Sequence, residues 1–159
     1  MGVIKVKTDS KADNTYLKNC IEYVLSGDSI YRNGFNIYPG DAYNQMMKVK
    51  EYYRKTSGNQ LVHIIVSFNV GISINKAIEY SKRIGAYYSD KYQIIYAIHY
   101  KNRETKRGEV CNSIHVHYVI NSVNFVNGKK YADNKSDVYM FVQYIKKVMH
   151  DDYWKVIYN

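Results

Sequence analysis

The sequence predicts an α+β fold, in which a central antiparallel β-sheet is flanked by helices. Two observations indicate this class. Short strand-like stretches are interspersed with longer stretches that carry apolar residues at helical spacing. The chain has 159 residues, of which 46% are hydrophobic and 23% charged, so it is long enough for one domain with a substantial core and too apolar to stay disordered.

The chain opens with a strand, a helix and an extended segment. Val3 to Lys7 alternate apolar and basic residues, which predicts the strand. Asn14 or Thr15 is expected to cap a helix over Tyr16–Leu25. Ile30–Tyr38 is expected to be extended and to end before the Pro-Gly pair that follows it.

Two further helices are expected on either side of an apolar strand. Asp41 can cap a helix that runs through Arg54 and stops at Gly58. Leu61–Phe68 is predicted to be a buried strand because it is almost continuously apolar. Ser73–Tyr88 is predicted to form the third helix, with its serine as the cap.

The second half of the chain begins with a pair of strands. Tyr92–Tyr100 and Ser113–Ser122 are the predicted strands, and the polar stretch Lys101–Asn112 is predicted to be the loop that joins them. Asn127-Gly128 then predicts a hairpin turn between two short strands. A last helix, capped by Ser136 or Asp137, is expected to run to about residue 149.

The charge balance favours a polyanionic partner. Lys and Arg number 23 against 14 acidic residues, which gives a net charge of +9. Charge alone leaves open a basic soluble protein of another kind. The 19 tyrosines can pack by their rings and can also stack on nucleic-acid bases.

Cysteine usage and hydropathy exclude several classes of protein. Cys20 and Cys111 are too few for a disulfide framework, and neither has a Cys-x-x-Cys partner for a zinc ribbon. No signal peptide or membrane span is visible in the sequence. We therefore expect a cytoplasmic location and no membrane partner.

The residues with the most chemical information are three histidines on the predicted strand pair. His115 and His117 are two residues apart on one strand, so both imidazoles should point to one face, while Ile114, Val116 and Tyr118 form the other. His99 lies near the end of the preceding strand, and a hairpin would bring it back toward the pair. Three imidazoles around an open position make a metal site of catalytic type. From spacing alone, a polar sheet face with surface histidines remains an alternative.

Tyr23 is the candidate nucleophile. The first predicted helix has an apolar stripe of Leu17, Cys20, Ile21, Val24 and Leu25, and Tyr23 falls outside the centre of this stripe. A phenol at a metal site can attack phosphorus once it is deprotonated. A tyrosine that merely packs on the flank of the helix is the alternative.

Four segments, taken in order, resemble the relaxase/mobilisation nuclease family of conjugative plasmids and transposons, in its MobP-like branch. They are LKNCIEYVLS, VHIIVSF, YAIHY and IHVHYVINSVNF, from Leu17–Ser26 to Ile114–Phe125. Each segment alone is a weak signal. The ordered set, with a helical tyrosine before the His-hydrophobic-His (HUH) pattern, is fairly specific.

The resemblance implies a function and a set of residues. In this family the helical tyrosine cuts one DNA strand at an origin of transfer, forms a 5′-phosphotyrosine link and later rejoins strands. It matches Tyr23, and the metal histidines match His99, His115 and His117. The resemblance implies an HUH endonuclease or relaxase-like fold and a single catalytic domain over residues 1–159, with a fragment of a longer protein left open.

The resemblance also implies cofactors and partners. The family is described as using Mg²⁺ or Mn²⁺, whereas three imidazoles suit Mn²⁺, Zn²⁺, Co²⁺ or Ni²⁺ better than Mg²⁺. The expected partner is single-stranded origin-of-transfer DNA, with accessory DNA-binding and coupling proteins. We expect a bacterial protein that acts as a monomer.

The predicted loop over residues 101–112 is longer than the short turn usual in this family. A slipped hairpin would leave Glu104 or Glu109 as a third ligand in place of His99. The loop is also a candidate for gripping DNA phosphates. The candidate DNA-binding residues are Arg32, Arg103, Lys106, Arg107, Lys129 and Lys130.

Other interpretations of the sequence remain. A rolling-circle replication initiator or HUH transposase has the same metal chemistry, and there the tyrosine follows the histidine pair, as Tyr144 does in Tyr144-Ile145-Lys146-Lys147. A non-catalytic nucleic-acid-binding module is the alternative of another class. His63, on the apolar strand, is expected in the core or in a second layer around the metal, and a role as a metal ligand is the less favoured alternative.

Overall fold

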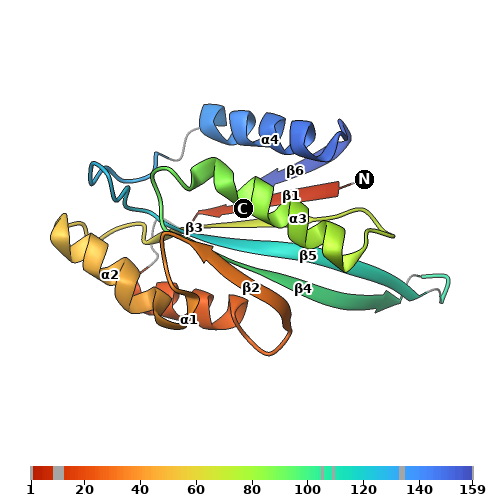
Figure 1. Ribbon diagram of the computed structural model, residues 1–159, viewed down its shortest axis with the longest axis horizontal. Helices are drawn as coiled ribbons and strands as arrows, with labels where there is room; N and C mark the ends of the chain where they lie inside the picture. The colour runs from red at the N-terminus through yellow and green to blue at the C-terminus, as the bar shows by residue number, and fades with distance from the viewer. Residues whose placement is uncertain (1, 9–12, 105, 109, 133–134, 159) are drawn as a thin grey trace.

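In the described part of the chain, six strands form one sheet in the order β2-β4-β5-β3-β1-β6 (Figure 1). The computed structural model describes residues 2–8, 13–104, 106–108, 110–132 and 135–158. The strands are β1 (Gly2–Thr8), β2 (Ser29–Phe35), β3 (Leu61–Ser67), β4 (Ile94–Glu104), β5 (Val110–Asn121) and β6 (Trp154–Tyr158). All neighbours are antiparallel except β1 and β6, which are parallel. The predicted α+β class is confirmed.

Among the described residues, four α-helices cover the sheet in two layers. The helices are α1 (Asn14–Val24), α2 (Ala42–Tyr52), α3 (Ile74–Gly85) and α4 (Lys135–Met149), with short 3₁₀ turns at Pro39–Asp41 and Ala86–Tyr88. Figure 1 shows α1 and α2 on one face of the sheet and α3 and α4 on the other. Because strand residues alternate between the faces, each face buries its own apolar cluster.

The alternation of β5 sets the face on which the chemistry lies. Ile114, Val116 and Tyr118 are buried in the cluster under α3 and α4, as predicted. Val119, on the opposite face, packs in the cluster beneath α1 and α2. The odd-numbered residues of β5, which include both histidines, therefore face the layer that carries α1.

Helix starts were predicted within a few residues. Ser73 caps α3 as expected, because its side chain accepts a hydrogen bond from the backbone N–H of Lys76. The expectation for α1 was wrong: Asp13 is the cap, and its carboxylate accepts from the backbone N–H of Tyr16 across 2.9 Å. The backbone of Asp13 is extended, which places its carboxylate oxygen over the first turn of the helix, where it can accept this hydrogen bond.

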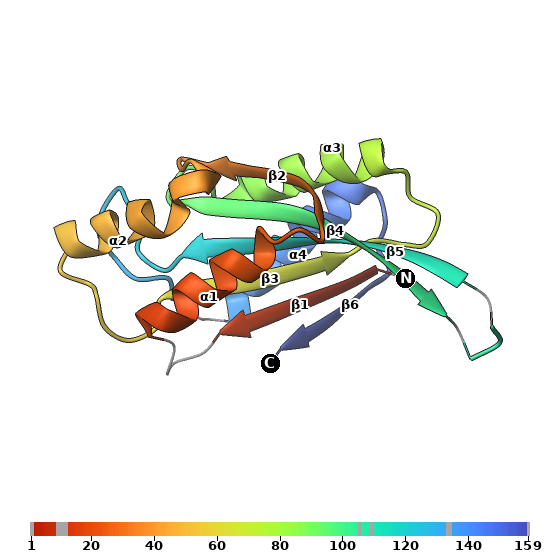
Figure 2. The same cartoon turned by 90° about the horizontal axis from the view of Figure 1, so that it is seen from below.

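The predicted loop over residues 101–112 is largely strand. β4 continues to Glu104 and β5 begins at Val110, with Glu104 opposite Val110. β2 and β3 end their pairing near His99 and Ile114, so beyond this point the two long strands pair with each other alone among the described strands. The result is a two-stranded arm that projects from the sheet in Figures 1 and 2.

Two other elements differ from expectation. The predicted hairpin around Asn127-Gly128 is a single bridge between Val123 and Lys130, and Gly128 supplies the positive φ of 72° that its turn needs. β6 was not predicted, because five residues after a helix carry little periodic signal. None of the described helices combines the length and apolar character needed to span a bilayer.

Candidate metal centre

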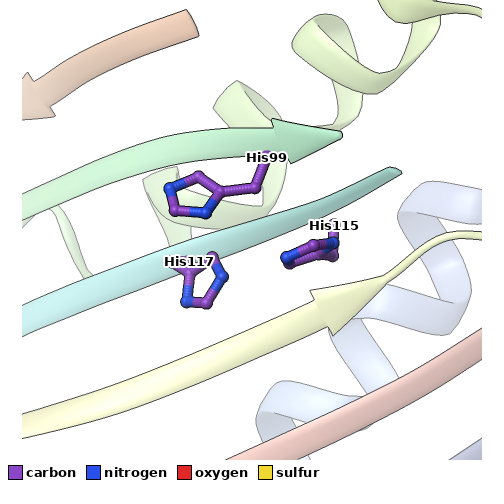
Figure 3. Close-up of side chains that lie close together, drawn as sticks. All are labelled: His99, His115 and His117. Carbon is purple, nitrogen blue, oxygen red and sulfur yellow. The ribbon is translucent and has the colours of Figure 1, made fainter. Parts of the chain in front are cut away.

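The β4–β5 register brings three histidines together. His99 on β4 lies directly opposite His115 on β5, and His117 follows two residues later on the same face. One ring nitrogen from each histidine lies within 4.8 Å of the others, and all three side chains are buried. Figure 3 shows the imidazoles converging from the two strands. The prediction that a hairpin returns His99 to the pair is confirmed.

A hydrogen bond orients His99. Its Nε2 lies 2.8 Å from the carbonyl oxygen of Val24, at the end of α1. A carbonyl oxygen only accepts, so Nε2 carries the proton and Nδ1 keeps its lone pair. The outer nitrogen of a metal-binding histidine usually has such a partner.

A second chain of contacts orients His117. Its Nδ1 lies 2.9 Å from Nε2 of His63 on β3, and the two rings lie 5.2 Å apart between centroids. On the other side of the His63 ring, Nδ1 lies 3.8 Å from Sγ of Cys20 on α1. His63 is thus buried behind a candidate ligand, in agreement with the expectation of a second layer.

These side chains are held neutral. Burial, together with the smaller effects of His63, His99, His115 and Lys7, lowers the pKa of His117 from 6.5 to about 2. Burial also lowers the pKa of His63 to about 4 and raises the pKa of the Cys20 thiol to about 11. A neutral imidazole is the form that binds a metal ion.

The cluster fits a divalent metal ion. Nε2 of His117 is fully buried and has no hydrogen-bond partner within the described part of the chain. A buried polar atom without a partner is costly unless something binds it. This nitrogen belongs to a set of three imidazoles, which is a donor set typical of transition-metal sites.

Tyr23 lies over the histidine cluster. Its ring centroid is 5.9 Å from that of His99 and 5.7 Å from that of His117. The side chain is 50% exposed, whereas Cys20 and Val24 on the same helix are buried, so Tyr23 is indeed off the apolar stripe. A phenol at this place borders both the candidate metal centre and solvent.

Tyr144 lies on the other face of the sheet. It belongs to α4, its ring packs 5.0 Å from that of Tyr87, and it borders the apolar cluster under α3 and α4. Its hydroxyl donates a hydrogen bond to the carbonyl oxygen of Arg83. The sheet therefore separates Tyr144 from the three histidines.

The structure places the predicted basic residues in different regions. Lys106 and Arg107 are exposed at the tip of the arm, beyond the last pair of β4 and β5 and away from the histidines at its base. Arg32 donates hydrogen bonds to Ser29 and to the carbonyl oxygen of Ser26, and it lines a pocket of about 670 Å³ beside α1. The histidines and Tyr23 do not line this pocket.

Lys129 and Lys130 lie past the far end of β5. Lys130 donates to the backbone carbonyls of Ser57 and Asn59, which ties two loops together. It is therefore an anchor of the fold, whereas Lys129 is exposed. The structure does not bring either of them to the histidines.

Three acidic or basic residues of the arm fall partly or wholly outside the description. Arg103 and Glu104 are on β4, but their side chains lie outside the described residues, as does all of Glu109. The backbone of Glu104 is five positions beyond His99, or roughly 16 Å along a strand. Since the hairpin has not slipped, His99 keeps its place beside the pair.

Sequence reasoning missed several residues at the site. Cys20 was assigned to the apolar stripe, and the carbonyl group of Val24 carries no sequence signal. Lys5 and Lys7 alternate with Ile4 and Val6, which are buried under α3 and α4, so the lysines share the histidine face. The sequence could not show that Lys7 lies opposite His63, because this depends on the register of β1 with β3.

The fold and the cluster define an α+β domain with a three-histidine candidate metal centre on one sheet face, beneath a helical tyrosine. A sequence model of the family described as "Relaxase: MobA/VirD2-like, nuclease domain" matches residues 23–154. The chain belongs to this family. The match begins at Tyr23 and includes the histidine triad. No curated protein matches the chain at a significant level.

Family membership gives the activity in outline. The chain is a relaxase-type nicking endonuclease that binds DNA. Relaxases of this family usually need a metal ion, and the buried histidine triad is able to bind one.

Proposed function

We propose that the protein is a relaxase that nicks single-stranded origin-of-transfer DNA, with Tyr23 as nucleophile and His99, His115 and His117 as metal ligands. The observation that carries this proposal is the packing of the Tyr23 ring on His99 and His117, at 5.9 and 5.7 Å between centroids. The nucleophile and the ligands come from a helix and a strand pair that are far apart in sequence, yet they meet at one point.

The proposed reaction is a transesterification. The Tyr23 oxygen attacks phosphorus in line, and a new phosphorus–oxygen bond forms as the bond to the 3′ oxygen breaks. The phenol releases its proton to solvent, which its half-exposed position allows, and the leaving 3′ oxygen takes up a proton to become a hydroxyl. The ester energy is retained in the 5′-phosphotyrosine link, so the reverse reaction can rejoin strands.

In the proposed reaction, the three histidines contribute to electrostatic stabilisation of the scissile phosphate through the metal ion that they would bind. His99, His115 and His117 would hold a divalent ion, which would supply Lewis-acid polarisation of the scissile phosphate and offset negative charge on its oxygens. Imidazole ligands suit Mn²⁺, Zn²⁺, Co²⁺ or Ni²⁺ better than Mg²⁺, which prefers oxygen ligands. We propose Mn²⁺ or Mg²⁺ as the physiological ion, in line with the family.

Basic residues on two sides of the centre support a path for DNA. Lys101 and Lys106 are exposed on the arm, which begins at the histidines. Lys5 and Lys7 lie across β3 on the same sheet face, where Figure 2 shows no helix over β1 and β6. A single DNA strand that crosses β5 at the histidines would meet positively charged side chains on both sides of the centre.

The setting of the reaction follows from the family. We propose that the protein acts in the bacterial cytoplasm during conjugative transfer, as a monomer, with accessory DNA-binding and coupling proteins at the origin of transfer.

Sequencing of covalent DNA ends tests this function. The protein is incubated with Mn²⁺ and a random single-stranded library, and DNA that stays linked after denaturation is sequenced. We expect one preferred junction, with a free 3′ hydroxyl on the released half. His115→Ala/His117→Ala protein is the matched control. Recovery of no linked DNA from the wild-type protein, or of as much from the control, would contradict the proposal.

A further inference from the structure

The residues behind His117 form a continuous buried chain of hydrogen bonds. His63 is 5% exposed and uses both ring nitrogens, one toward His117 at 2.9 Å and the other toward Cys20 at 3.8 Å. Among the described residues, no carboxylate takes part in these contacts. This pair replaces the single carboxylate or carbonyl partner that most metal-binding histidines have.

We propose that His63 and Cys20 are positioning residues, which fix the orientation and the tautomer in which His117 presents Nε2 to the metal ion. The inference rests on the metal centre of the proposed function. It concerns residues that touch neither DNA nor the ion.

The tautomer follows from the contacts. Nε2 of His117 is the buried nitrogen without a partner, so as a ligand atom it keeps its lone pair and the proton is on Nδ1. Nδ1–H then donates to Nε2 of His63, which leaves the proton of His63 on its own Nδ1. That N–H points to Sγ of Cys20, which accepts weakly. With Nε2 of His117 as the ligand atom, this one arrangement of protons satisfies both the His117–His63 and the His63–Cys20 contacts.

The chain of bonds begins on the helix that carries Tyr23. Cys20 and Val24 are three residues before and one residue after Tyr23 on α1, and they hold the outer nitrogens of His63 and His99. Residues at this spacing lie on one side of a helix. The place of α1 and the orientation of two metal ligands are therefore set together.

Calorimetric titration with Mn²⁺ tests the inference with two substitutions of His63. In His63→Leu the acceptor is lost while the buried volume is nearly kept, and we expect the affinity for Mn²⁺ to fall by about 10- to 100-fold. In His63→Gln the amide oxygen can accept from Nδ1–H of His117, so most of the affinity should return. Cys20→Ala should weaken binding less than His63→Leu, and Cys20→Ser should restore it.

The outcomes separate the inference from the function it rests on. If the wild-type protein binds no Mn²⁺, the metal centre itself is refuted. If it binds Mn²⁺ and folded His63→Leu binds equally well, only the positioning role is refuted. Should His63→Leu not fold, ¹⁵N NMR of the Zn²⁺-loaded wild-type protein decides: the proton of His117 is expected on Nδ1, and a proton on Nε2 overturns the inference.

Discussion

The carbonyl oxygen of Val24 accepts a hydrogen bond from Nε2 of His99 across 2.8 Å. Val24 is the last residue of α1 and directly follows Tyr23, so the helix end that presents the proposed nucleophile also orients a proposed ligand. A shift of α1 would therefore disturb both groups. This coupling explains how a tyrosine from one segment and histidines from a distant strand pair can keep fixed positions relative to each other.

Loss of the histidine pair should abolish metal binding. His115→Ala/His117→Ala removes two of three imidazoles, so no multidentate site remains, and Mn²⁺ binding by calorimetry should disappear while the circular dichroism stays native. His150→Asn is the control, because His150 is exposed and its positive φ of 52° suits asparagine. Unchanged Mn²⁺ binding in the double variant would refute the metal centre.

Binding of single-stranded DNA should depend steeply on salt. The net charge of +9 predicts release of counterions from many phosphates, so the affinity should fall sharply as salt rises. Lys101→Ala/Lys106→Ala on the arm should lower the slope of log K against log salt by about 1 to 1.5. Lys146→Ala/Lys147→Ala on α4 should leave it unchanged. Equal slopes for both pairs would exclude the arm from the interface.

The metal-free protein should lose stability in acid. In the folded chain the pKa values of His63 and His117 are lowered from 6.5 to about 4 and about 2. Below pH 6.5 the unfolded chain therefore binds protons at these two histidines more strongly than the folded chain does. The free energy of unfolding should therefore fall as pH drops below 6.5, by up to about 1.4 kcal/mol per pH unit for each histidine. Urea unfolding in chelator measures this, and His63→Gln should show a shallower fall.

The Asp13 cap of α1 should contribute to the stability of the fold. Asp13→Ala removes the acceptor of the Tyr16 N–H and should lower the free energy of unfolding by about 1 kcal/mol. Thr15→Ala should change it much less, because Thr15 is exposed inside the helix. Urea denaturation of the two variants compares them, and a larger loss in Thr15→Ala would contradict the observed cap.

The sequence predicted what depends on local pattern. Period-two spacing placed His115 and His117 on one face, and the apolar stripe of the first helix left Tyr23 outside it. Contacts between distant segments could not be predicted in the same way. The chain from Cys20 to His63 to His117 joins a helix and two strands, and only the register of β3 with β5 brings it together.

The arm shows a second limit. Residues 101–112 are polar, and polar composition favoured a loop, yet the backbone pairs through Glu104 and Val110. The sequence of this stretch shows no alternation of apolar and polar residues, which is the pattern that would have indicated strands. β6 was also not indicated by local pattern, because its pairing partner β1 is at the other end of the chain.

Mass spectrometry of the covalent adduct tests the central claim most directly. Wild-type protein linked to its cleaved strand is digested with trypsin, and the linked peptide is sequenced by fragmentation, since the peptide between Lys18 and Arg32 contains Tyr31 besides Tyr23. We predict the nucleotide on Tyr23, no adduct in Tyr23→Phe with DNA and metal binding kept, and an adduct in Tyr144→Phe. A nucleotide on Tyr144 would contradict the account and favour a replication initiator.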